Sequence, residues 1–114
     1  GVATIFDVLA EPKRRRILDL LRTHERSVGE MVDALGISQP AVSKHLRILK
    51  QAGLVEDRAV AQRRVYCLRA EPLMELDHWL ASYRLIWEQK LDDLEEYLVR
   101  LQNKEQSNDR NTQQ

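Results

Sequence analysis

The sequence has few of the residues that define several large classes of protein. Its 114 residues include a single cysteine, which excludes an internal disulfide framework and fits a reducing cytoplasm. No apolar run approaches the roughly 20 residues that a membrane-crossing helix needs, and we recognise no signal peptide. Aromatic residues make up only 5% of the chain and charged residues 32%. We therefore expect one small soluble domain in the cytoplasm.

The residue patterns of enzymes are also missing. The sequence has no nucleophile–base set, no Gly-rich phosphate loop and no carboxylate pair with catalytic spacing. We therefore expect neither an enzyme nor a cofactor. The lone Cys67 has no cysteine or histidine neighbour in sequence, and we interpret it as a buried apolar thiol in preference to a redox switch.

The net charge of zero hides an uneven distribution along the chain. Residues 38–70 contain seven basic side chains against two acidic ones, Glu56 and Asp57, whereas residues 71–114 contain five basic and ten acidic ones. Such asymmetry is more informative about partners than the total charge is. A basic segment of this kind favours a nucleic-acid partner for residues 38–70.

The segment 38–53 contains the signals of a complete helix. Ser38 is a suitable N-cap, and Gly53 suits the left-handed position that ends a helix. Between them, Val42, Leu46 and Leu49 form one apolar stripe that faces a core. The opposite face is polar or cationic and has no acidic residue. It is either a DNA-contacting face or an ordinary solvated one.

The residues before this helix favour DNA contact. Ser27-Val-Gly-Glu30 is a capping box that opens a short helix, and Gly36 ends it. A helix, a turn and a second helix with a basic outer face make the helix-turn-helix pattern. We therefore predict that the second helix contacts DNA through Ser38, Gln39, Pro40, Ser43, Lys44, Arg47 and Lys50.

Residues 54–59 and 63–69 are rich in β-formers and predict an antiparallel hairpin, the wing of a winged helix. The tip, residues 60–62, has no Gly, Asn or Asp, so we expect a longer or looser turn than a two-residue one. Arg58, Arg63 and Arg64 are predicted to reach phosphates or a minor groove, the alternative being solvated strand arginines. The expected fold is mainly α with a small β-hairpin.

Two features of the N-terminal half allow two interpretations. Residues 13–16 are all basic, and we interpret them as a solvated face partly paired with Glu11 and Asp19, in preference to a flanking phosphate contact. His45 borders the apolar stripe of its helix. We favour a wedged, hydrogen-bonded structural role for it over a phosphate contact.

A long helix is predicted from Pro72 to about residue 101. Its apolar residues have a mean spacing of about 3.5, the coiled-coil period. At nearly 30 residues the helix would be about 45 Å long, longer than the roughly 34 Å diameter of a compact chain of this size. We therefore predict a homodimer in preference to packing within one chain. The expected interface residues are Ile5, Leu76, Trp79, Leu80, Tyr83, Trp87, Leu91 and Leu94. The domain would span residues 3–101, and the polar residues 102–114 would form a disordered tail.

Four stretches in this order give the chain a family resemblance: residues 11–21, 27–30, 38–46 and 52–55. Together they resemble the ArsR/SmtB family of bacterial winged-helix repressors. The resemblance implies a repressor that regulates its own promoter and a neighbouring operon. Two recognition helices related by the two-fold axis of the predicted dimer would require an inverted-repeat operator. Two other functions stay open: an effector-responsive sensor on the same scaffold, and a winged helix that binds protein.

The ligand sets of the metal-sensing ArsR proteins are incomplete in this chain. Residues 27–32, where the thiolate type has its Cys-x-Cys, contain no cysteine. The last-helix type is represented only by Asp77, His78 and Glu88, and a zinc site with one imidazole would be unusual. We therefore expect no metal site and interpret His78 as a helix-face residue.

Overall fold

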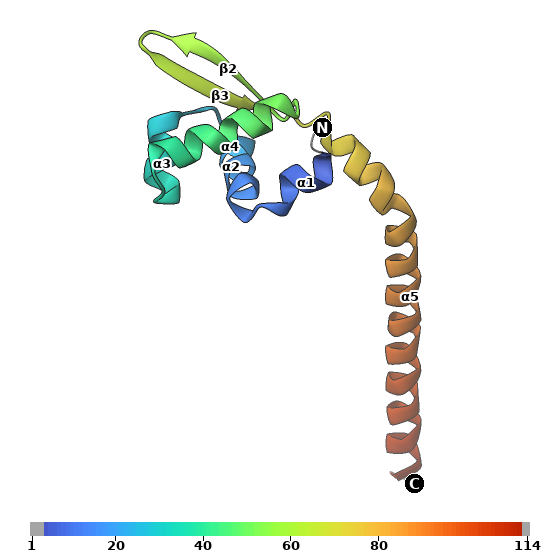
Figure 1. Ribbon diagram of the computed structural model, residues 1–114. Helices are drawn as coiled ribbons and strands as arrows, with labels where there is room; N and C mark the ends of the chain where they lie inside the picture. The colour runs from blue at the N-terminus through green and yellow to red at the C-terminus, as the bar shows by residue number, and fades with distance from the viewer. Residues whose placement is uncertain (1–3, 113–114) are drawn as a thin grey trace. The chain divides into compact units, whose positions relative to one another are not determined.

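The computed structural model describes the backbone of residues 4–112 and the side chains of residues 4–108. Its elements, in chain order, are α1 (Ile5–Ala10), α2 (Pro12–Thr23), β1 (Arg26–Ser27), α3 (Val28–Leu35), α4 (Gln39–Gln51), β2 (Val55–Val60), β3 (Arg63–Leu68) and α5 (Leu73–Thr112) (Figure 1). Contacts divide the chain into two units, Gly1–Asp77, here called the winged unit, and His78–Gln114. The predicted fold class, mainly α with a β-hairpin, is confirmed.

The helix boundaries of the winged unit follow from local capping chemistry. The Ser27 hydroxyl accepts from the Glu30 backbone N–H at 3.2 Å, and the Glu30 carboxylate accepts from the Ser27 N–H at 3.1 Å. These two bonds complete the predicted capping box, and the bond from the Ser27 backbone lowers the pKa of Glu30. Ser38 caps α4 by accepting from the Ala41 N–H. Gly53, with φ of 76°, takes the left-handed position that follows α4.

The core of the winged unit gathers one face of each of its first four helices. Val42, Leu46 and Leu49, the predicted stripe of α4, are all at most 1% exposed. They pack with buried residues of α1, α2, α3 and the start of the hairpin, among them Ile17, Leu21, Met31, Leu54 and Val55. This packing fixes which face of α4 points outward.

One predicted interface residue lies in this core. Ile5 is only 7% exposed and belongs to the core cluster of its own chain. The Thr4–Asp7 capping box sets the start of α1, and Ile5 then shares an inward face with Val8. Ile5 therefore contributes to the core of its own chain, and its place at a dimer interface stays a prediction.

The hairpin forms a three-stranded antiparallel sheet in the order β1-β3-β2. The short β1 was not predicted, since two residues carry no periodic signal. Val60 pairs with Arg63, which leaves only Ala61 and Gln62 in the turn. Ala61 adopts a left-handed φ of 55°. The predicted looser tip is therefore wrong: the hairpin closes tightly by placing an alanine where glycine is usual.

The predicted C-terminal end of α5 also differs from the structure. α5 continues to Thr112, whereas the sequence predicts a disordered tail from Gln102. Side chains from Leu101 to Asn108 are exposed, so packing within the chain does not hold this part of the helix. Extending an existing helix adds one hydrogen bond per residue without a new nucleation step, and Gln, Lys and Glu are good helix formers. Within the described residues, no helix is long and apolar enough to span a membrane.

Candidate nucleic-acid interface

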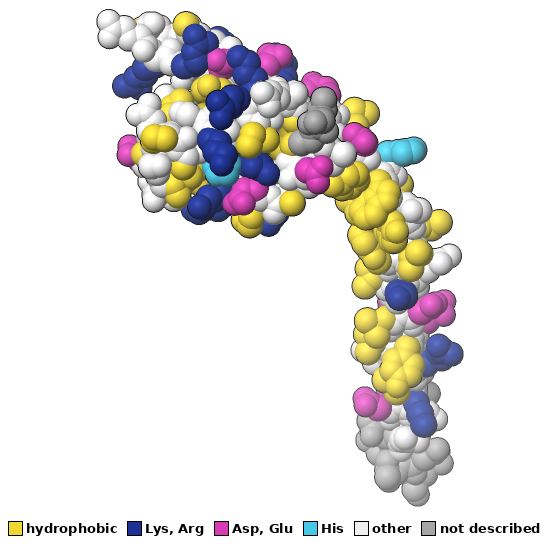
Figure 2. Space-filling model, viewed as in Figure 1, with side chains coloured by type: hydrophobic (Ala, Val, Ile, Leu, Met, Phe, Trp, Pro, Cys, Tyr) yellow, Lys and Arg dark blue, Asp and Glu magenta, His cyan; other side chains and the backbone are white. Residues whose placement is uncertain are grey.

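The outer face of α4 is the centre of the candidate interface. Every residue that the sequence predicts to contact DNA from this helix is exposed: Ser38, Gln39, Pro40, Ser43, Lys44, Arg47 and Lys50. The helix has no acidic residue, and its buried stripe fixes its rotation. Figure 2 shows Lys and Arg side chains gathered on the visible surface of the winged unit. This face offers hydrogen-bonding and cationic groups of the kind that read base edges and bind phosphates.

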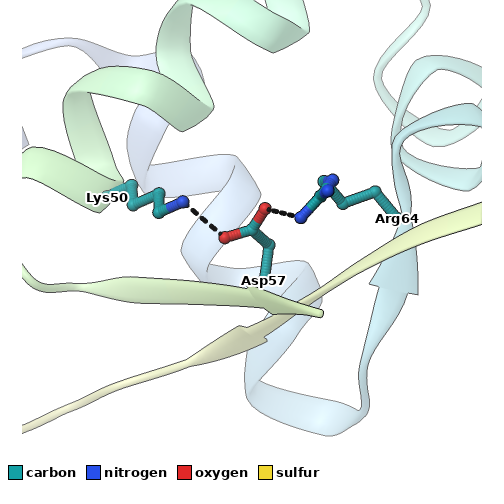
Figure 3. A network of polar contacts seen from close by, with 3 residues as sticks. All are labelled: Lys50, Asp57 and Arg64. Carbon is teal, nitrogen blue, oxygen red and sulfur yellow. Dashed lines mark hydrogen bonds and ion pairs between the residues drawn. The ribbon is translucent and has the colours of Figure 1, made fainter. Parts of the chain in front are cut away.

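A buried carboxylate connects α4 to the wing. Asp57 of β2 receives Lys50 Nζ on one oxygen and Arg64 Nη1 on the other, each at 2.7 Å (Figure 3). The Asp57 side chain is 6% exposed, whereas those of Lys50 and Arg64 are more than half exposed. The hydrogen bond from Lys50, followed by that from Arg64, lowers the pKa of Asp57 despite its burial. We call these three residues the Asp57 network.

The Asp57 network includes two of the residues that are predicted to contact DNA. Lys50 and Arg64 are exposed but already hold an intramolecular partner. The Lys50 ammonium thereby connects α4 to β2, whereas the Arg64 guanidinium connects β3 to β2 within the hairpin. Sequence reasoning missed Asp57 because it was counted only as an acidic residue that reduces the charge of the segment.

The other wing arginines differ from Arg64. Arg58 donates to Glu25 at 2.6 Å, so it too has a partner within the chain. Arg63 precedes Arg64 in β3, so the two side chains leave the sheet on opposite faces. Both nevertheless border one open hollow of about 510 Å³, together with Gln39 of α4 and Glu30 of α3. The structure thus brings the wing tip, the start of α4 and the start of α3 around one concave surface.

The basic cluster of residues 13–16 has a structural role of an unexpected kind. Arg14 Nε donates to the Val8 carbonyl at 2.6 Å, and Arg15 Nη1 donates to the Leu9 carbonyl at 2.6 Å. Both arginines thereby satisfy carbonyls in the last turn of α1, where cations are favoured. The sequence predicted carboxylate partners for this cluster, and the structure gives these two arginines backbone partners.

His45 lies on α4 at the border of the core and is half-buried. Its Nδ1 atom is buried and has no hydrogen-bond partner among the described residues. The predicted hydrogen bond is thus missing at this nitrogen. Burial, and then the nearby Arg14 guanidinium, lower the pKa of His45 because both disfavour the imidazolium form.

The candidate metal and thiol residues do not form a site in the structure. Among the described residues, no three His, Cys, Asp or Glu side chains gather closely enough to hold a metal ion. Cys67 is a free cysteine of intermediate exposure, less buried than the sequence predicted.

Most of the predicted dimer residues of α5 are exposed within the chain. Trp79, Tyr83, Trp87, Leu91 and Leu94 are among its exposed large apolar side chains, and Leu76 and Leu80 are half-buried. The rings of Trp79 and Tyr83 are in tilted contact, with their centroids 5.0 Å apart and an interplanar angle of 51°. Figure 2 shows apolar side chains along the visible face of this helix. An apolar surface of this extent marks an interaction site.

These features define the class of the protein. A helix-turn-helix formed by α3 and α4, followed by a β-hairpin wing and a basic exposed face on α4, makes it a winged helix-turn-helix DNA-binding protein. A model of the bacterial regulatory protein arsR family matches residues 11–57. The transcriptional repressor SdpR of Bacillus subtilis is 34% identical over 69% of this chain and 88% of its own length. The chain therefore belongs to the ArsR family of transcriptional regulators.

Two further comparisons agree with this assignment. The transcriptional activator HlyU of Vibrio cholerae is 38% identical over 67% of this chain and 73% of its own length. A crystal structure of an ArsR family transcriptional regulator superposes with a TM-score of 0.64 at 28% identity, covering 74% of this chain and 87% of that chain. Both similar proteins are transcriptional regulators, which places this chain among regulators and not among enzymes.

Proposed function

We propose that the chain is a homodimeric, cytoplasmic repressor that binds an inverted-repeat operator and occludes a promoter, including its own. The observation that carries this proposal is the exposed outer face of α4, which is free of acidic residues and is held at a fixed rotation by Val42, Leu46 and Leu49. Two such helices related by a two-fold axis would enter successive major grooves about 34–36 Å apart. Repression is the stated role of the relative SdpR.

The residues of α4 and of the wing have different proposed roles. Gln39, Ser43 and Lys44 lie in the N-terminal half of α4, the part that reaches base edges in helix-turn-helix proteins. Arg47 and Arg63 are proposed to hold phosphates. Lys50 and Arg64 would join them only by exchanging Asp57 for a phosphate, since both are paired in the free protein.

The test is DNA selection followed by titration. Random duplexes retained by the protein are sequenced, and binding to the selected operator and to a scrambled duplex is measured at several salt concentrations. Gln39→Ala or Ser43→Ala should weaken operator binding by about 1–3 kcal/mol and scrambled DNA less. Arg63→Ala should weaken both duplexes alike and reduce the salt slope by about 0.9 per lost phosphate contact.

A matched control and a clear contrary result complete this test. Arg100→Ala removes an exposed cation from α5 and should leave both titrations unchanged. Retention of no preferred sequence would contradict the proposal and favour the protein-binding alternative. Because the relative HlyU is an activator, the direction of regulation is measured separately, by transcription from a promoter that contains the selected site.

A further inference from the structure

The two flanks of α4 carry different polar groups. Lys50, on the flank of the wing, is paired with Asp57 of β2. His45 comes five residues earlier, which places its side chain about 140° from that of Lys50 around the helix. The charged groups that act on His45 come from the start of α2, which packs against α4, and from α4 itself. His45 therefore lies on the flank of α4 that faces α2, away from the wing.

The two ring nitrogens of His45 have different surroundings. The ring is half-buried, and its Nδ1 atom is buried without a hydrogen-bond partner among the described residues. A buried N–H without an acceptor is costly, whereas a nearby cation such as the Arg14 guanidinium stabilises a lone pair. We therefore assign the hydrogen of the neutral ring to Nε2. This N–H is the only donor of the neutral ring, and no hydrogen bond occupies it within the described residues.

The charges around His45 suit a negatively charged partner. Burial and then Arg14 lower the pKa of His45, and Lys13 and Lys44 act more weakly in the same direction. Glu11 opposes them, and its carboxylate also accepts from the Lys13 backbone N–H. Arg14 already donates to carbonyls of α1, whereas the ion pairs of the described residues do not include Lys13. This flank thus combines an N–H donor with an unpaired ammonium group.

We propose that His45 Nε2 donates to a DNA phosphate beside Lys13, and that DNA binding transfers a proton from the solvent to this ring. A helix in the major groove has a sugar–phosphate backbone along each flank. The wing lies toward one backbone, and the flank that faces α2 lies toward the other. A bound phosphate stabilises the imidazolium form that the free protein disfavours, and so raises the pKa of His45. The inference rests on the proposed function and adds to it a second anchor and a pH dependence.

The pH dependence of operator binding tests the proton transfer. Binding to the selected operator is titrated between about pH 8 and about pH 6, the range in which histidine responds to its surroundings. The parent protein should bind about threefold or more tightly at the lower pH, because the charged ring holds the phosphate more strongly. Glutamine has an N–H donor but does not titrate, so His45→Gln should lose this dependence. His24→Gln, at the C-terminal end of α2, is the control and should keep it. A parent protein with pH-independent operator binding would refute the inference and leave the proposed function standing.

Neutral phosphates locate the contact with the parent protein itself. Operator duplexes in which one phosphate at a time is replaced by an uncharged methylphosphonate are titrated at both pH values. One position in each half-site should weaken binding and remove the pH dependence, and a dependence that survives every replacement would refute the phosphate contact.

The salt dependence tests the role of Lys13. Lys13→Ala should lower the salt slope by about 0.9 for each subunit. Arg22→Ala, which removes an exposed cation from the last turn of the same helix, should leave the slope unchanged. Equal slopes for the parent and Lys13→Ala would exclude Lys13 from the contact. Failure to select any operator would instead contradict the proposed function.

Discussion

Asp57 offers the sharpest test of the interface, because its removal should have opposite effects on folding and on DNA binding. Asp57→Asn keeps the shape of the side chain but removes its charge. Both ion pairs of the Asp57 network then disappear, and Lys50 and Arg64, whose side chains are 56% and 57% exposed, become free in solvent. The same change removes a negative charge from the surface that is proposed to meet phosphates.

The expected loss of stability follows from the exposure of the partners. Ion pairs with an exposed partner contribute about 0.2–1 kcal/mol each, so two pairs give a loss of roughly 0.5–2 kcal/mol. A loss of 1 kcal/mol lowers the melting temperature of a domain of this size by about 4–8 °C. Because Asp57 has a lowered pKa, its contribution is present above the ordinary pKa of about 3.9 and is lost as the pH falls below that value. The difference between parent and variant should therefore shrink on acidification below about pH 4.

DNA binding should change in the other direction. Freed Lys50 and Arg64 each add about 0.9 to the salt slope when they gain a phosphate, so Asp57→Asn should bind scrambled DNA more tightly and with a steeper slope. Glu56→Gln is the matched control: it makes the same charge change at the adjacent residue and removes only the pair with Arg69. If Asp57→Asn and Glu56→Gln had equal effects in thermal unfolding and in salt titrations, the assigned role of the network would be refuted.

Three further predictions follow from particular residues. Ala61→Gly should stabilise the winged unit by about 1 kcal/mol in thermal unfolding, because glycine adopts the left-handed φ of this position without strain. An unchanged or lower stability would show that the backbone of Ala61 is not strained. Unfolding free energy should fall as the pH drops below about 6.5, since the unfolded chain takes up a proton that folded His45 resists, and His45→Leu should flatten this dependence. Leu91→Glu should raise the dimer dissociation constant by orders of magnitude in sedimentation experiments, because it buries a charge at the predicted dimer interface; an unchanged constant would exclude Leu91 from that interface.

The features that the sequence predicted correctly are those fixed by neighbours along the chain. The reciprocal bonds between Ser27 and Glu30 join residues three apart, and the Ser38 cap acts within one turn. The buried stripe of α4 likewise needs only the helical period to be recognised. The exposed face of α4, the centre of the candidate interface, could therefore be predicted before the tertiary structure was known.

Features that depend on how elements pack could not be predicted in this way. An apolar residue such as Ile5 serves a core or an interface equally well, and its membership of the core depends on how α1 packs against the other helices. The bonds from Arg14 and Arg15 to the end of α1 depend on the direct connection of the two helices at Glu11, which follows α1 and caps α2. Neither partnership leaves a periodic signal in the sequence.

The Asp57 network depends on the register of the hairpin. Side chains alternate along a strand, so shifting the hairpin register by one residue would move Arg64 to the opposite face. The observed register pairs Ala59 with Arg64, which puts Arg64 diagonally beside Asp57 on the same face, and this register requires the tight turn at Ala61. A looser tip, as the sequence predicts, leaves the register open, so the position of Arg64 beside Asp57 could not be predicted from the sequence. The pairing of a surface charge in this wing is thus decided by the conformation of one alanine.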